Sequence, residues 1–170
     1  GGIEKLLELL EVEGMDVMEL TVLATITGMA VRGNADSISC LADLGGIQTL
    51  LRVLKRNLER ATNATSPSSA KKRGGGGSGK KHKPKTKPLP GLSPAGTQIV
   101  YYGAAAACLS ALSALGRHHM EIRQRILEEG ILQMCFHLLS VREVLGSVLP
   151  SFKDLLDGHM GAQNVFREQG

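Results

Sequence analysis

The sequence predicts an all-α protein built from a repeated helical unit. A phrase that opens with Gly-Ile occurs three times, at residues 2–10, 46–54 and 130–138. Each copy continues with two variable residues, a pair of apolar residues and a closing apolar position. Aromatic residues make up only 3% of the 170 residues and Trp is absent. The core must therefore be aliphatic, which favours close packing of helices over a β-sandwich.

The first part of the chain, residues 1–62, contains four predicted helices. Residues 3–10 carry an apolar stripe at helical spacing. Residues 15–31 are apolar on nearly every side, which predicts a buried central helix. Asn34 is a suitable N-cap for a short helix that ends near Asp43, and Gly45-Gly46 terminates it. The next helix, from residue 47 to about 60, has leucines on one face and basic residues on the other.

The last part, residues 97–170, contains five predicted helices. The segment from 97 to 115 is rich in alanine and suited to close packing. A short amphipathic helix follows at 120–129, and Gly130 opens the third Gly-Ile phrase. Ser140 and Glu143 have the spacing of a capping box, which predicts a helix over 141–157 with a kink at Pro150. A final short helix is expected at 160–167.

Residues 63–96 differ in composition from the rest of the chain. They hold five of the six prolines and no Asp or Glu. Their eight basic residues are Lys71, Lys72, Arg73, Lys80, Lys81, Lys83, Lys85 and Lys87. Since the whole chain has a net charge of +4, the remaining residues carry −4. Such a tract buries too little apolar surface to offset its chain entropy, so we expect a long disordered insertion.

The spacing of the Gly-Ile phrases indicates the architecture. The first two begin 44 residues apart, and the third begins 40 residues before Gly170. The second and third are 84 residues apart, or 50 without the 34-residue insertion. Three helices in a period of about 40 to 47 residues are typical of armadillo repeats. Residues 34–46, 46–60 and 98–116 resemble the first, second and third helices of such a repeat. The resemblance implies an α-solenoid of about three repeats.

The armadillo resemblance implies a non-catalytic scaffold or adaptor that binds a protein partner. In this family the third helices, here 15–31, 97–116 and 141–157, line a concave face. Importin-like and catenin-like members bind extended peptides there through Trp and Asn ladders. The matching positions are Ala24 and Ser110 for Trp, and Gly28 and Ala114 for Asn. The face is therefore unsuited to clamping a peptide backbone, while recognition of a folded or helical partner stays open. Two alternatives are a nucleotide-exchange cofactor of a heat-shock chaperone and the substrate arm of a ubiquitin ligase.

The basic insertion carries two motif-like patterns. Residues 74–81 imitate a phosphate-binding loop, but Lys81 stands where Ser or Thr would hold Mg²⁺ and no strand precedes it. Clusters at 71–73 and 80–85 have the composition of a nuclear import signal or of a contact for nucleic acid or an acidic surface. We expect any such contact through the insertion only, and a cytoplasmic or nuclear location. A solvated insertion without a specific partner is the simpler interpretation.

No catalytic, cofactor or metal site is predicted, and no small-molecule substrate. Cys40, Cys108 and Cys135 are expected to be reduced core thiols; Cys135, His137 and the His118-His119 pair form the one conceivable metal cluster. The carboxylates of residues 4, 8, 128 and 129 are interpreted as side chains on exposed helix faces. No stretch reaches 18 apolar residues, so no membrane span is expected. The chain lacks an initiator Met and starts inside a repeat, which suggests a fragment with neighbouring repeats in a longer parent.

Overall fold

The described residues are helical throughout, with short turns between the helices. A computed structural model describes residues 1–12, 16–32, 35–64, 89–117, 119–158 and 160–169. Within them the helices are α1 (Gly2–Glu11), α2 (Asp16–Val31), α3 (Ala35–Asp43), α4 (Gly46–Ala64), α5 (Pro94–Gly116), α6 (Met120–Glu128), α7 (Ile131–Leu139), α8 (Leu145–Leu156) and α9 (Met160–Gln169). The predicted all-α class is confirmed for these residues.

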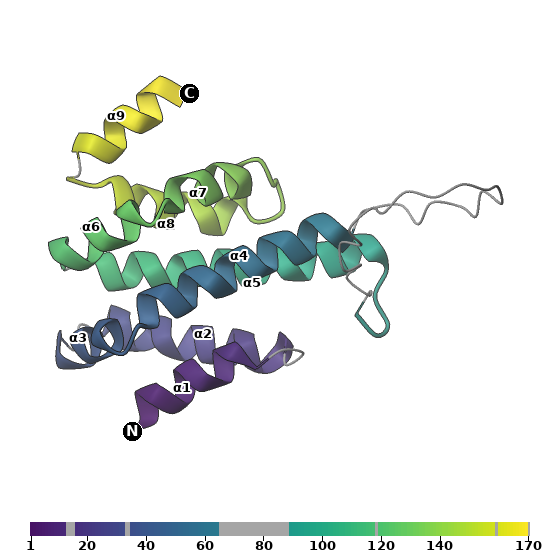
Figure 1. Ribbon diagram of the computed structural model, residues 1–170. Coiled ribbons are helices and arrows are strands. Elements are labelled where there is room, and N and C mark those ends of the chain that lie inside the picture. The colour runs from purple at the N-terminus through teal and green to yellow at the C-terminus, as the bar shows by residue number, and fades with distance from the viewer. Residues whose placement is uncertain (13–15, 33–34, 65–88, 118, 159, 170) are drawn as a thin grey trace, which may run out of the picture.

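The longer helices lie in two layers. Helices α1, α4 and α7 form one layer, in which α4 contacts both of the others (Figure 1). Helices α2, α5 and α8 form the second, in which α5 packs between α2 and α8. The most extensive helix contact joins α4 to α5, so the two helices that flank the insertion are packed neighbours. The short helices α3 and α6 pack against α4 and α7 respectively, and α9 packs against α8.

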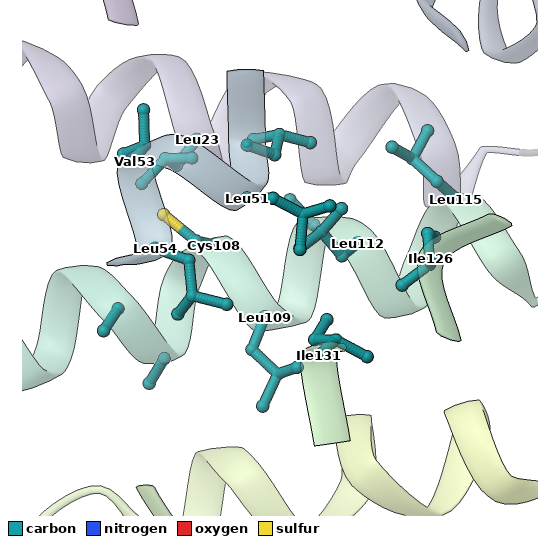
Figure 2. Packing of buried hydrophobic residues seen from close by; sticks show 14 of the residues in the cluster. Leu23, Leu51, Val53, Leu54, Cys108, Leu109, Leu112, Leu115, Ile126 and Ile131 are labelled. Carbon is teal, nitrogen blue, oxygen red and sulfur yellow. The ribbon is translucent and has the colours of Figure 1, made fainter. Parts of the chain in front are cut away.

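Helix α5 is the centre of the core. It contacts α2, α4, α6, α7 and α8. Its leucines 109, 112 and 115 are almost fully buried, and the small side chains of Ala105 and Ala111 are completely buried. Figure 2 shows Cys108 of α5 next to Leu23 of α2 and Val53 of α4. Alanines let neighbouring helices approach closely, so the alanine-rich sequence of α5 explains how one helix packs against five others.

Glycines mark two of the turns between helices, for different reasons. Gly45 and Gly130 both have φ of 78°, a left-handed conformation that ends α3 and α6. Gly46, the first residue of α4, instead lies against Leu41, where an added Cβ would stand 2.6 Å from the backbone oxygen. The second Gly-Ile phrase therefore needs its glycine for space and the third for backbone conformation.

Helix α2 is half-exposed, which corrects the expectation of a helix buried on every side. Val22, Leu23 and Ile26 are buried, but Met18 is 36% and Leu20 39% exposed. The reason is its position in the second layer. Among the described helices it contacts α1 and α3 as well as α5, and its remaining face has no helix over it.

The limits of the insertion also need correction. Helix α4 continues to Ala64, past its expected end at about residue 60 and past the expected start of the insertion at 63, and α5 begins at Pro94 instead of 97. Ser93 is the N-cap of α5: its side chain accepts a hydrogen bond of 3.1 Å from the backbone N–H of Gly96, and Pro94 occupies the first turn. Leu89 packs against the core and its N–H donates to Thr97 Oγ1 at 3.1 Å. The expected disorder of residues 65–88 lies outside the described residues.

Helix α8 starts later than the capping-box pattern predicts. Residues 142–144 form turns, and the helix begins at Leu145 instead of 141. The hydroxyl of Ser140 donates to the carbonyl of His137 at 2.6 Å, so it closes α7 and does not cap α8. Helix α8 continues through Pro150 to Leu156.

Candidate interaction face

Helices α2, α5 and α8 leave one side of their layer uncovered by the described residues. Apolar side chains are exposed on these three helices: Leu20 on α2 is 39%, Ile99 on α5 47% and Leu149 on α8 50% exposed. Small residues that are exposed or half-buried lie along the same helices. We call this surface the α2–α5–α8 face and define it by Leu20, Ala24, Gly28, Ile99, Gly103, Ala107, Ser110, Gly146, Leu149 and Lys153.

A row of polar side chains links α5 to α8 along this layer. The hydroxyls of Ser110 and Ser151 are 3.0 Å apart. Farther along, Asp154 accepts hydrogen bonds from Ser113 at 3.5 Å and from Arg117 at 2.6 Å. Arg117 is 46% and Asp154 28% exposed, so the ion pair lies at the surface and contributes at most about 1 kcal/mol to stability. Its geometric effect is to fix the register of α8 against α5.

Three of the four positions matched to the Trp and Asn ladders of armadillo proteins lie at the surface. Ala24 is exposed, and Gly28 and Ser110 are half-buried. Ala114 is only 4% exposed and belongs to the core, so its assignment to an exposed Asn position was wrong. Helices α8 and α6 both pack against α5, and they contact it on either side of Ala114: Asp154 of α8 bonds to Ser113, and Arg123 of α6 bonds to the carbonyl of Gly116. The three surface positions carry side chains too short to reach a peptide backbone.

A buried polar cluster beneath α2 was missed by sequence reasoning. Glu19 is 5% exposed and accepts hydrogen bonds from Arg56, at 2.6 Å, and from the amide of Asn57. Arg56 also donates to the backbone carbonyl of Leu10 at 2.9 Å. The cluster thus joins α1, α2 and α4. The sequence does contain a signal for this cluster: Glu19 is a carboxylate within the apolar stretch of α2. A buried charge needs a partner, so its position indicates a paired basic or polar side chain.

Arg123 is a second missed residue. It is 7% exposed on α6 and donates only to backbone carbonyls: from Nε to Gly116 at 3.1 Å, from Nη2 to Arg117 at 2.9 Å, and from Nη1 to Asp157. Its guanidinium therefore satisfies the C-terminal ends of both α5 and α8, which carry partial negative charge. The expected amphipathic pattern of α6 assigned no role to this residue.

The three thiols differ in their environments. Cys108 and Cys135 are completely buried, as expected, but Cys40 is exposed on α3. Burial raises the pKa of the Cys108 thiol well above its usual value, and the nearby charge of Glu19 raises it further. Burial raises the pKa of Cys135 to about 12. Both buried thiols are thus protonated and unreactive at neutral pH.

The conceivable metal cluster does not assemble among the described residues. Cys135 is completely buried, whereas His137 is exposed and its Nε2 lies 3.3 Å from the hydroxyl of Tyr102. No group of three potential ligands occurs in the part of the chain that the structure describes, and His118 lies outside it. The basic residues at 71–73, 80, 81, 83, 85 and 87, and the imitation phosphate loop at 74–81, also lie outside the described residues.

One described helix is long and apolar enough to cross a membrane. This is α5, and 72% of its most apolar 18-residue window is buried inside the protein. Helix packing therefore accounts for its apolar sequence, as in the core helix of a folded domain. The absence of a membrane span stays a prediction.

Comparison of the chain with known protein families, with curated proteins and with solved structures found no match. The resemblance to armadillo repeats therefore rests on the sequence pattern, and its functional consequences are proposals.

Proposed function

We propose that the chain is a protein-binding scaffold or adaptor module of armadillo type, with the α2–α5–α8 face as its concave binding surface. The observation that carries the proposal is the side-by-side packing of α2, α5 and α8 in one layer that leaves Leu20, Ile99 and Leu149 exposed. The order of the contacts supports it, because helices about one repeat apart in sequence are neighbours in each layer.

The chemistry of the face favours a folded or helical partner. Small residues at Ala24, Gly28 and Ala107 let a partner's backbone come close, and the exposed leucines supply apolar area on either side. Burial of such leucines makes the free energy of binding more favourable by about 25 cal/mol for each Å² of apolar surface taken from water. The polar row that ends at Arg117 and Asp154 adds directional contacts at the rim.

Affinity capture with quantitative mass spectrometry tests the proposal. The immobilised full chain is compared with a Leu20→Glu, Leu149→Glu double variant and with Met120→Glu as control. Met120 is 60% exposed on α6, outside the face, so the control adds the same type of charge at another exposed apolar position. We expect specific proteins to be lost from the double variant and retained by the control. Equal capture by all three chains would refute the assignment of the face.

A further inference from the structure

A short exposed segment leads into the central helix α5. Leu89 to Leu92 form a β-turn, which is closed by a hydrogen bond of 3.1 Å from the N–H of Leu92 to the carbonyl of Leu89. Pro90 and Gly91 take its two central positions, and the φ of Gly91 is 77°, as the third position of a type II turn requires. Leu89 packs against the core and its N–H donates to Thr97, so the turn is anchored to the folded protein.

Ser93 follows this turn and is presented to solvent. Residues 90–95 are all exposed. The backbone of Ser93 is extended, with φ −66° and ψ 162°, and Pro94 comes directly after it. Protein kinases bind the segment around the acceptor hydroxyl in an extended form. A kinase with an apolar pocket for the next residue selects proline, because proline has no N–H that would be left unpaired there. Ser93 and Pro94 therefore have the sequence, conformation and exposure of a substrate for a proline-directed kinase.

The hydroxyl of Ser93 is free to react. Its oxygen accepts one hydrogen bond, of 3.1 Å, from the N–H of Gly96, and no acceptor for its own proton occurs among the described residues. In the transfer, Oγ forms a bond to the γ-phosphorus of ATP while the bond from that phosphorus to the bridging oxygen of ADP breaks. A carboxylate of the kinase takes the hydroxyl proton.

The start of α5 can accommodate the phosphorylated product. The first N–H groups of a helix have no acceptor within it, and the helix dipole gives this end a partial positive charge. A phosphate on the N-cap residue is therefore favourable. No Asp or Glu occurs in the sequence between Glu59 and Glu121, so α5 and the segment before it carry no carboxylate that would repel the phosphate.

We propose that Ser93 is a phosphorylation site for a proline-directed serine/threonine kinase and is accessible to it in the folded protein. The site lies at the start of α5, and the proposal does not rest on the function proposed for the α2–α5–α8 face.

Phosphorylation of the full chain by a mitogen-activated protein kinase with Mg²⁺ and ATP tests the inference. Because residues 66–67 are a second Ser-Pro pair, the substrate is the Ser66→Ala chain. We expect one phosphate per chain, which mass spectrometry of the peptides places on Ser93. Ser140 is exposed but is followed by valine, so it should stay unmodified and is the internal control. Pro94→Ala should lower the rate at least about tenfold, since the kinase loses the residue that it selects.

A free peptide of residues 88–98 measures how far the fold hides the site. We expect the kcat/KM of the folded chain to lie within about tenfold of the peptide value, because only the exposed N-cap hydrogen bond has to open. Phosphorylation should also raise the Tm of the chain by about 1–3 °C through the helix dipole. Absence of phosphate from Ser93, an undiminished rate with Pro94→Ala, a kcat/KM below that range, or a fall in Tm on phosphorylation would each overturn the proposal.

Discussion

Replacement of Arg123 by methionine should destabilise the protein more than any other single change of an arginine on α6. Methionine preserves the unbranched stem of the side chain but removes the guanidinium and all its donors. Three backbone carbonyls, at Gly116, Arg117 and Asp157, then lose their hydrogen-bond partner. These carbonyls end α5 and α8, two of the three helices that form the α2–α5–α8 face.

The expected loss is about 3 kcal/mol. A hydrogen bond from a charged donor contributes about 1.5–3 kcal/mol, so three bonds set an upper limit of about 9. Two reductions apply. Arg117 and Asp157 are exposed residues whose carbonyls can bind water instead, whereas Gly116 is buried. The variant also avoids the desolvation of a buried guanidinium that has no carboxylate partner among the described contacts. For a chain of this length, about 3 kcal/mol corresponds to a fall in Tm of roughly 6–12 °C.

Urea denaturation followed by circular dichroism at 222 nm measures this loss. Arg125→Met is the matched control, because Arg125 is exposed on the same helix and should change stability by less than about 0.5 kcal/mol. Arg123→Lys should fall between the two, since an ammonium group retains the charge but not the planar fork that reaches three carbonyls. The reasoning is refuted if Arg123→Met and Arg125→Met have the same midpoint.

Three further experiments have distinct expected outcomes. Gly46→Ala should destabilise the protein by about 2 kcal/mol, because the added Cβ would clash with Leu41. Gly28→Ala should stabilise it by about 0.5–1 kcal/mol, because no atom lies within 4 Å of the added Cβ and alanine favours the helix. The Tm values of the two variants measure both effects. Replacing residues 65–88 by a short Gly-Ser turn should leave Tm nearly unchanged, because each doubling of loop length costs only about 0.6 kcal/mol. Replacing residues 63–96 should lower Tm, because it also removes Ser93, the N-cap of α5. In native protein at pH 8, a thiol reagent should modify one cysteine, Cys40, and in urea all three; modification of two or more thiols in the native state would contradict the burial.

The raised thiol pKa values also predict a dependence of stability on pH. Because the folded-state pKa of Cys135, about 12, exceeds the unfolded value of about 8.5, the unfolded chain loses this proton first as pH rises. The contribution of this thiol to stability is therefore complete below about pH 8 and is lost progressively between about pH 8.5 and 12. Cys135→Ser should flatten that part of a stability profile measured by urea titration. An unchanged slope would contradict it.

Local patterns predicted the helices well, because apolar spacing, glycine turns and capping residues act within a few positions. The start of α8 moved because Ser140 bonds back to His137, a local alternative to the capping box that the residue spacing does not distinguish. The end of the insertion moved because Leu89 packs against the core, and a window of neighbouring residues does not show this contact. Sequence reasoning also missed Arg123, because its three acceptors lie on segments before and after it that only the fold brings together.

The candidate face could be predicted only as a set of helices. The third-helix assignment identified α2, α5 and α8, and the structure places these helices side by side. Which residues of each helix are exposed depended on rotation about the helix axis, and α2 and α5 are too uniformly apolar for their sequence to specify it. Ala114 was misassigned for this reason, and the sequence did not indicate that Leu20 and Leu149 are exposed.

Hydroxyl-radical footprinting of the chain bound to a captured and purified partner tests the proposed face most directly. The method measures the oxidation of individual side chains, and its reference is the unbound chain. We expect protection of Leu20, Ile99 and Leu149, with no change at Met120. Protection confined to α3, α6 or the α1–α4–α7 layer, with these three side chains still oxidised, would contradict the account.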